Sequence, residues 1–299
     1  MFGILNINKP TGWTSRDVVN RAHRFVRPAK AGHAGTLDPL ATGVLIVAVG
    51  QATRLVDYAH RLPKFYRATF QLGYRSPSDD IDTTVEHLEQ AHVPSQQQVE
   101  TALSAFVGVI QQRPPAFSAV HVAGQRSYKL ARKGESVELK PRPVTIHSLD
   151  LVHYQYPELV LDIRCGGGTY VRSLGRDLAH SLDTCAVMSS LERVSIGELD
   201  VSTAINVDDI ENQLDKVLLS PRPLVEAISW ISLSNEEVVE LHHGRTIRRE
   251  ENRIESPRWE DEYSWRDVAG VDPEGRVVAI MQATQDGRFR PLRNFPLSA

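Results

Sequence analysis

Cysteine is scarce in this sequence of 299 residues. Its two cysteines, Cys165 and Cys185, form neither a CxxC pair nor part of a paired-histidine motif. A disulfide framework and a structural zinc site are therefore not expected, and the pattern favours a reduced, cytoplasmic protein. The eleven histidines are scattered, and the adjacent His242 and His243 cannot both point from one face of a helix. We predict no metal site.

Long apolar runs are also missing. No run approaches the roughly 20 residues that a helix needs to span a bilayer. The first residues, MFGI, lack the basic start and the long apolar core of a signal peptide. The sequence therefore predicts a protein of the cytoplasm that has no membrane segment.

Motifs for cofactors and for hydrolytic nucleophiles are missing as well. The three glycines at 166–168 lack the Gly-Lys-Ser/Thr ending of a P-loop and the spacing of a dinucleotide fingerprint. The chain contains no Gly-x-Ser-x-Gly elbow of the hydrolase type. We therefore expect no cofactor. Beyond these glycines, a predicted helix start presents Tyr170 and Arg172, and an arginine there can pair with a carboxylate or a phosphate.

An overall basic charge is absent too, since the formal net charge is −3. The average hides an asymmetry, because residues 1–150 carry a net charge of +6 and residues 151–299 a net charge of −9. Two basic stretches stand out, at 21–33 and 113–142. Polyanion binding needs a local basic surface rather than a basic average, so either stretch is a candidate for RNA contact. The alternative is an ordinary solvated surface.

The most distinctive segment that is present surrounds Asp38. Gly35 and Gly43 permit unusual backbone angles, and Pro39 pushes Asp38 towards an extended conformation. The apolar run 44–49 follows at once and predicts a buried strand. Asp38 is thus predicted on a stiff loop, where catalytic groups concentrate. From the local pattern alone, an aspartate that only closes a turn is an equal alternative.

The remaining periodicity predicts an α/β (α+β) body and a small β-rich tail, with domains at 1–222 and 223–299. Helices are expected at 16–25, 52–60, 97–106, 127–133, 170–182, 210–219 and 236–243. Strands are expected at 2–8, 44–49, 65–72, 118–122, 144–154, 159–165, 191–196 and 277–281. One aspartate, two tyrosines (Tyr66 and Tyr170), an arginine, a histidine and two basic stretches, without a cofactor motif, suit chemistry on a base turned out of RNA.

Five segments of the chain also resemble, in the same order, the motifs of one enzyme family. They are residues 7–15 (INKPTGWTS), 33–43 (HAGTLDPLATG), 64–68 (KFYRA), 113–132 with RPPAFSAV and GQRSYKLAR, and 165–174 (CGGGTYVRSL). Together they are similar to the motifs of the TruB-type tRNA pseudouridine synthases. The tail resembles this family's small PUA-type domain only loosely.

The resemblance implies a fold and a set of roles. The fold is a central mixed, largely antiparallel sheet flanked by helices, and catalysis needs neither metal nor cofactor. Asp38 matches the essential nucleophile, which attacks ribose C1′ or base C6. The other matched residues are Arg172, expected to pair with Asp38; Tyr66, expected to stack on the flipped uridine; Tyr170 and Leu191, lining the pocket; His33, holding the T-loop open; Lys9, structural or close to RNA; and Lys129 and Arg132, in an RNA-gripping insertion at about 112–145.

The implied function is isomerisation of uridine to pseudouridine at position 55, in the T-loop of tRNA. The implied partner is the T-stem-loop, bound by a monomer with no obligate protein partner. Two alternatives stay open at this point. One is a tRNA-elbow chaperone without essential chemistry, and the other is a relative that depends on a guide RNA and on protein partners.

Overall fold

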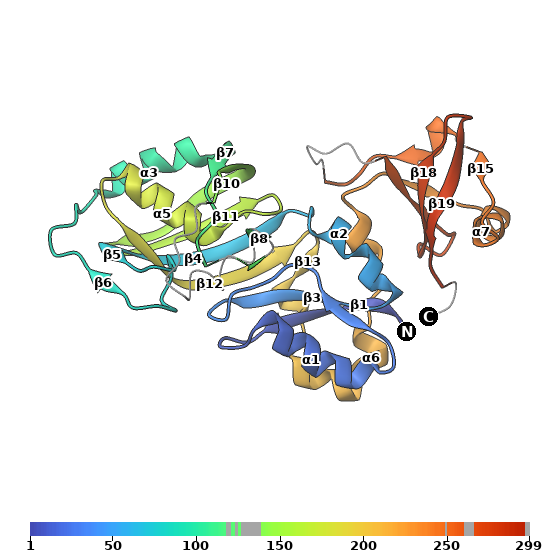
Figure 1. Cartoon of the computed structure of the whole chain (residues 1–299), viewed down its shortest axis with the longest axis horizontal. Coiled ribbons are helices and arrows are strands. Elements are labelled where there is room, and N and C mark those ends of the chain that lie inside the picture. The colour runs from blue at the N-terminus through green and yellow to red at the C-terminus, as the bar shows by residue number, and fades with distance from the viewer. Residues whose placement is uncertain (118–120, 123–124, 127–138, 249, 260–265, 297–299) are drawn as a thin grey trace. The chain divides into compact units, whose positions relative to one another are not determined.

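The computed structural model describes residues 1–296 apart from 118–120, 123–124, 127–138, 249 and 260–265 (Figure 1). The helix predicted at 127–133 and most of the strand predicted at 118–122 lie outside the described residues. The chain forms two compact units, Met1–Leu62 with Ser195–Ala299, and Pro63–Val194. The predicted domain boundary at 222 falls inside the first unit and stays a prediction.

The first unit begins with a pair of strands. Strand β1 (Phe2–Lys9) runs antiparallel to β3 (Thr42–Gly50) from Phe2 opposite Gly50 to Lys9 opposite Gly43, and β2 (Ala31–His33) pairs antiparallel with the end of β3. Residues 43–49 of β3 are all buried. Burial of both faces explains why the sequence of β3 is an unbroken apolar run rather than an alternating one.

Helix α1 (Ser15–Val26) covers these strands. Thr14 is its N-cap and forms a capping box with Asp17. Its apolar face packs on one side of β1 and β3, together with helix α6 (Ile210–Val217). The buried members of this cluster are Leu5, Ile7, Val18, Val19, Ala22, Val26, Leu45, Val47, Val49, Val207 and Ile210.

The C-terminal part of the first unit is a sheet of six strands in the order β15-β19-β18-β17-β14-β16. Its strands are β14 (Trp230–Ser232), β15 (Ile247–Arg248), β16 (Ile254–Glu255), β17 (Asp267–Val271), β18 (Val277–Ala283) and β19 (Arg288–Asn294), with helix α7 (Asn235–His242) beside them. Only β14 and β17 pair in parallel among the pairings described. The predicted β-rich tail is confirmed.

The other elements of the first unit are short and lie between its longer strands and helices. They comprise α2 (Val56–Ala59), β13 (Leu199–Asp200) and the 3₁₀ turns η1 (Gln51–Leu55), η3 (Val201–Thr203), η4 (Val207–Asp209), η5 (Arg222–Val225) and η6 (Glu251–Arg253). The helix predicted at 52–60 is therefore a 3₁₀ turn followed by a single α-helical turn. Strand β13 pairs with the end of β12 (Ala186–Ile196), through Ser195 and Ile196.

The second unit contains the strand order β12-β4-β11-β10-β7. Strands β4 (Lys64–Leu72), β11 (Glu158–Cys165), β10 (Arg142–Gln155) and β7 (Gly108–Gln112) pair antiparallel in that sequence. Helices α3 (Gln96–Leu103) and α5 (Val171–Ser181) and the turn η2 (Ser104–Phe106) belong to the same unit. Two small hairpins complete it, β5 (Tyr74–Arg75) with β6 (Glu86–His87), and β8 (His121–Val122) with β9 (Gln125–Arg126).

No helix among the described residues is long and apolar enough to cross a membrane.

Candidate active site

Asp38 lies half-buried in the loop between β2 and β3. The loop bends at Gly35 and Gly43, whose φ angles of 100° and 94° fall in the region that favours glycine. The amide of Ala41 donates to the carbonyl oxygen of Asp38 over 3.1 Å, which closes a turn. The structure therefore contains the turn that the sequence suggested. The two clamps on this loop go beyond what a turn requires.

The first clamp comes from helix α1 and acts on the residue before Asp38. The buried hydroxyl of Ser15 accepts from the amide of Leu37 over 2.8 Å and donates to the carbonyl oxygen of Leu37 over 3.2 Å. A single side chain thus occupies both polar groups of Leu37. Since Ser15 is the first residue of α1, the helix and the Asp38 loop are linked directly.

The second clamp comes from β1 and acts on the residue after Asp38. Lys9 is fully buried, and its Nζ donates to the carbonyl oxygens of Pro39, Trp13 and Pro10 over 3.2, 2.6 and 2.9 Å. The amide of Gly12 also donates to Pro39 over 2.8 Å. A buried ammonium needs such acceptors to offset its desolvation. Of the two roles predicted for Lys9, these contacts support the structural one.

Arg172 is the second residue of α5, in the other unit, and is almost fully buried. Its Nη1 lies 3.2 Å from Oδ2 of Asp80 and donates to the carbonyl oxygen of Ser78 over 2.8 Å. Its Nη2 donates to the carbonyl oxygen of Phe117 over 3.0 Å. Asp80 is buried as well, and its other oxygen accepts from the hydroxyl of Ser78 and the amide of Asp82.

Asp80 is the residue of this region that sequence reasoning missed. The acidic segment 76–84 reads as a polar loop, and such residues are usually solvated. The available signal was the pair of adjacent acidic residues Asp79-Asp80 in a chain that also contains Arg172, for which the sequence suggested Asp38 as the partner. A carboxylate buried beside a guanidinium can hold that group in one orientation.

Tyr170 is held through its backbone at the start of α5. The side chain of the buried Gln112 accepts from the amide of Tyr170 over 2.8 Å and donates to its carbonyl oxygen over 3.0 Å. The guanidinium carbon of Arg142 lies 5.1 Å from the centre of the Tyr170 ring, within cation–π range. The ring therefore has a fixed base and a cationic neighbour.

The other predicted residues are distributed as follows. Tyr66 lies in β4 opposite Ile163, and Leu191 lies in β12; both are buried. His33 is half-buried in β2. Lys129 and Arg132 lie outside the described residues. Lys9, His33 and Asp38 belong to the first unit, whereas Tyr66, Tyr170, Arg172 and Leu191 belong to the second. Their convergence on one site stays a prediction.

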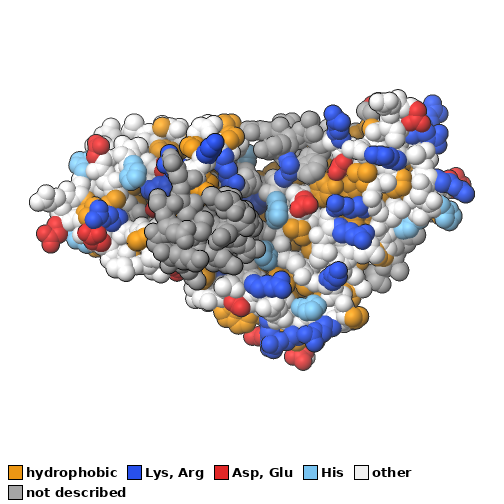
Figure 2. Space-filling view, viewed as in Figure 1, with side chains coloured by type: hydrophobic (Ala, Val, Ile, Leu, Met, Phe, Trp, Pro, Cys, Tyr) orange, Lys and Arg blue, Asp and Glu red, His pale blue; other side chains and the backbone are white. Residues whose placement is uncertain are grey.

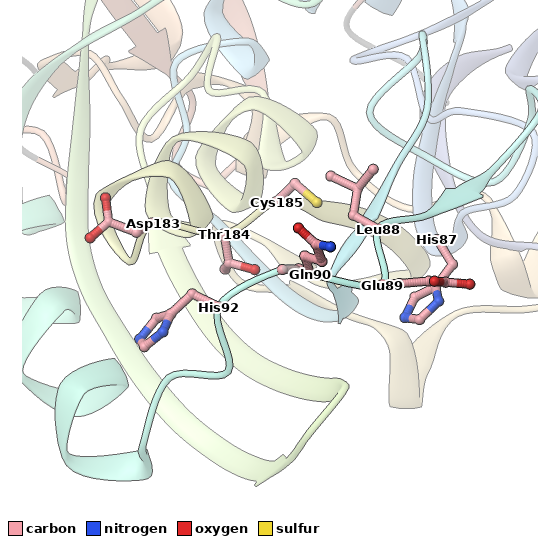
Figure 3. A pocket seen from close by; sticks show the side chains of 9 residues that line it. His87, Leu88, Glu89, Gln90, His92, Asp183, Thr184 and Cys185 are labelled. Carbon is pink, nitrogen blue, oxygen red and sulfur yellow. The ribbon is translucent and has the colours of Figure 1, made fainter.

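A cavity of about 590 Å³ in the second unit does not coincide with these residues (Figure 3). Segments 87–92 and 183–185 line it. Its side chains include His87, His92, Glu89 and Asp183, and none of the predicted site residues is among them. The cavity therefore gives no support to the predicted site residues, and the Asp38 loop and the Arg172 helix are described separately, each within its own unit.

Part of the first basic stretch is exposed at the surface. Arg24, Arg27 and Lys30 are exposed, while Arg21 pairs with Asp208 over 2.7 Å. Figure 2 shows Lys and Arg side chains gathered over the region of α1 and also over the C-terminal sheet. The positive charge near α1 agrees with the basic N-terminal half of the sequence, whereas the positive charge over the C-terminal sheet lies in the half whose net charge is −9.

Solved structures share this fold. A crystal structure of a Cbf5–Nop10–Gar1 complex matches 99% of this chain and 84% of the matched chain, with a TM-score of 0.75 and 23% identity. The structure of an H/ACA RNP bound to a substrate RNA containing 2′-deoxyuridine matches 99% of this chain and 86% of that chain, with a TM-score of 0.73 and 22% identity. These likenesses confirm the predicted pseudouridine-synthase fold with its C-terminal β-rich, PUA-like part.

Sequence comparison identifies the family. The family model described as TruB family pseudouridylate synthase (N terminal domain) matches residues 23–171. A tRNA pseudouridine synthase B of Microcystis aeruginosa is 41% identical over 261 residues, 85% of this chain and 87% of that protein. One of Dehalococcoides mccartyi is 36% identical over 300 residues, 99% and 97% of the two chains. The chain belongs to the TruB family of pseudouridylate synthases, so the predicted family and enzyme class, an isomerase, are confirmed.

Proposed function

We propose that this enzyme converts uridine to pseudouridine in tRNA, at position 55 of the T-loop, with Asp38 as the nucleophile. The single observation that carries the assignment of Asp38 is the double clamp, by Ser15 on Leu37 and by Lys9 on Pro39. Nucleophilic catalysis depends on holding the attacking group in a productive position. The relatives named tRNA pseudouridine synthase B support the substrate.

The reaction exchanges one glycosidic bond for another. The Asp38 carboxylate attacks either ribose C1′ or base C6, and the N1–C1′ bond breaks. The uracil turns within the site, C5 bonds to C1′, and the bond to Asp38 breaks, which restores the free carboxylate. The proton on C5 is then lost and N1 gains one, so the product is an isomer of the substrate. Arg172 supports the ionised form of Asp38, because a nearby positive charge lowers the pKa of a carboxyl group.

The remaining residues hold the substrate. Tyr66 stacks on the everted uracil, a contact type that contributes about 1–3 kcal/mol per base. Tyr170 and Leu191 complete the pocket, and His33 keeps the T-loop open. Lys129 and Arg132 grip the RNA from the insertion, and Lys9 acts through the Asp38 loop. The enzyme works as a cytoplasmic monomer on the T-stem-loop, without a metal, a cofactor or an obligate protein partner. The chaperone alternative is not favoured, because the relatives are named as synthases.

The test uses an unmodified tRNA transcript, the purified chain and chemical mapping of pseudouridine. Asp38→Asn keeps the size of the side chain but removes the nucleophile, so we expect the rate to fall on the order of 10⁴-fold or more. The melting temperature and the affinity for the transcript should stay close to those of the wild type. Asp215→Asn, at an exposed position on α6, is the matched control and should be fully active.

Persistence of pseudouridine at position 55 with Asp38→Asn would refute the assignment of the nucleophile. A bare T-stem-loop serves as second substrate. Modification of it by the chain alone is the expected result, whereas a requirement for a guide RNA or another protein would contradict the proposed mode of action.

A further inference from the structure

Helix α5 carries a second arginine, Arg176, one turn after Arg172. Residues four apart lie on the same helical face, so the two side chains leave α5 in the same direction. The mechanism uses Arg172 and assigns nothing to Arg176. The Arg176 side chain is nonetheless only 20% exposed, although arginine is usually solvated.

Arg176 uses its guanidinium to join three segments. Its Nη1 donates to Oδ2 of Asp79 over 2.9 Å, and its Nη2 donates to the carbonyl oxygen of Arg113 over 3.0 Å. Its Nε donates to Asp177, the next residue of α5, over 2.9 Å. The planar fork of arginine is required for such divergent contacts, which a lysine cannot reproduce.

The first partner, Asp79, supports the loop that holds Arg172. Asp79 directly precedes Asp80, and its φ of 61° is uncommon for a residue other than glycine. Its carbonyl oxygen accepts from the amide of Met188 over 3.0 Å. Burial raises the pKa of Asp79, and the positive charge of Arg176 opposes that rise. Arg176 therefore stabilises a strained, charged residue within the loop.

The second partner lies at the start of the insertion predicted to grip RNA. Arg176 binds the carbonyl oxygen of Arg113, and Arg172 binds that of Phe117. The two arginines thus hold a segment of five residues at both ends. A charged donor forms a strong hydrogen bond with a main-chain carbonyl oxygen, so these two bonds fix the path of the segment where it leaves the sheet.

We propose that Arg176 is a positioning residue that sets the affinity of the enzyme for its RNA, by fixing the segment 113–117 at the base of the insertion. The proposal rests on the proposed function, since it assumes an RNA substrate. Arg176 acts through Arg113 and Asp79 rather than through contact with RNA. Arg172 holds the other end of the segment and is also assigned a role in the chemical step, whereas Arg176 acts on binding alone.

The experiment compares four proteins on the unmodified transcript: the wild type, Arg176→Lys, Arg176→Gln and Arg253→Lys. Arg253 is the matched control, because it also joins a carboxylate, Glu237, to a main-chain carbonyl, that of Ser232, and is 30% exposed. We expect KM and Kd to rise about tenfold for both Arg176 variants, the size of one lost charge-assisted hydrogen bond. The single-turnover rate at saturating RNA should stay within about twofold. Arg253→Lys should change neither quantity.

Salt dependence separates positioning from direct phosphate contact. A residue that contacts phosphate contributes about one unit to the slope of log Kd against log salt concentration, and its removal lowers that slope. For Arg176→Gln we expect an unchanged slope. A slope lower by about one unit would overturn the positioning role, as would an unchanged KM or a loss confined to the single-turnover rate.

Asp79→Asn serves as the control for folding defects. It removes the negative charge that Arg176 binds and leaves the hydrogen bond between Arg176 and the carbonyl oxygen of Arg113 in place. This variant should raise Kd less than Arg176→Gln does, and an equal or larger rise would contradict the proposal. Failure of the proposed function gives a different result. In that case the wild type makes no pseudouridine at position 55, while the direct binding measurements still test the role of Arg176.

Discussion

Lys9 carries a positive charge inside the protein, and the acceptors described for it are main-chain carbonyl oxygens. The hydroxyl of Ser15 likewise hydrogen-bonds to the backbone of Leu37, and Arg172 donates to two further carbonyl oxygens. At the scale of the residue, these buried polar groups hold the backbone in place. Burial of each of these polar groups has a high desolvation cost, and its removal leaves the backbone partner without a hydrogen bond. The resulting loss of stability is large enough to be measured.

Lys9→Met should lower both the stability and the activity. Methionine fills a similar volume but donates no hydrogen bond, which leaves buried carbonyl oxygens without that donor. We expect the free energy of unfolding to fall by about 2–4 kcal/mol and the catalytic rate constant to fall as the Asp38 loop loosens. Urea denaturation and single-turnover kinetics measure the two effects. Lys216→Met, at an exposed position of α6, should alter neither.

The buried thiol of Cys165 should make the folded protein less stable at alkaline pH. Burial raises the pKa of its thiol from 9.0 to about 11. Between pH 9 and 11 the unfolded chain loses this proton while the folded chain keeps it, so stability is intact below pH 9 and declines as the pH rises to 11. The decline amounts to about 2–3 kcal/mol. Cys165→Ala should flatten the curve of unfolding free energy against pH in this range, and an identical slope would contradict the argument.

Some of these residues could be predicted from the sequence and others could not. Asp38 and Arg172 stand in short motifs of unusual composition, so the sequence singles them out as candidates, and their roles stay predictions. The clamps escaped notice because a lysine next to a turn and a serine at a helix start have ordinary explanations. Asp80 was missed for a similar reason, since an acidic loop is normally solvated. Their roles depend on contacts across 22 to 94 residues, which no local pattern contains.

At the scale of the element, two neighbouring hydroxyl groups at the start of α1 have different roles. Thr14 caps the helix, whereas Ser15 binds the Asp38 loop. Thr14→Ala should lower the free energy of unfolding by about 1 kcal/mol and leave the rate constant unchanged. Ser15→Ala should lower the stability by about 1–3 kcal/mol and also reduce the rate constant. Equal rate constants for the two variants would show that the link between Ser15 and Leu37 has no catalytic consequence.

The elements themselves were predicted unevenly. Helices with a capping residue, such as α1 after Thr14 and α3 after Ser95, were found to within a few residues. Strands β4 and β11 alternate strongly and were found as well. Strand β7, with five residues, and β2, with three, were missed. Such short strands exist because neighbouring strands supply their partners, so tertiary pairing rather than local propensity decides them.

At the scale of the whole molecule, the C-terminal sheet shares a hydrophobic core with the first strands. Ile4, Val44 and Ile46 cluster with Ala269, Val277, Ile280 and Phe295. Phe2 stacks on Phe295 with ring centres 5.2 Å apart, and the hydroxyl of Tyr58 donates to Asp267 over 2.8 Å. The predicted boundary at 222 would cut through this cluster, which also contains Leu224 and Val225. The sheet and the strands should therefore unfold together.

Two phenylalanines of equal burial test this coupling. Phe295 belongs to the shared cluster, whereas Phe289 belongs to the separate core within the C-terminal sheet, and each is 1% exposed. Phe295→Ala and Phe289→Ala should each cost about 3–5 kcal/mol. Hydrogen exchange followed by mass spectrometry should then show faster exchange in both β1 and β18 for Phe295→Ala. For Phe289→Ala, the larger effect should fall on β18 and β19. If Phe295→Ala speeds exchange in β18 while β1 stays protected, residues 223–299 form an independent folding unit. The shared core then contributes little to the stability of β1, which carries Lys9, and of β3, which follows the Asp38 loop.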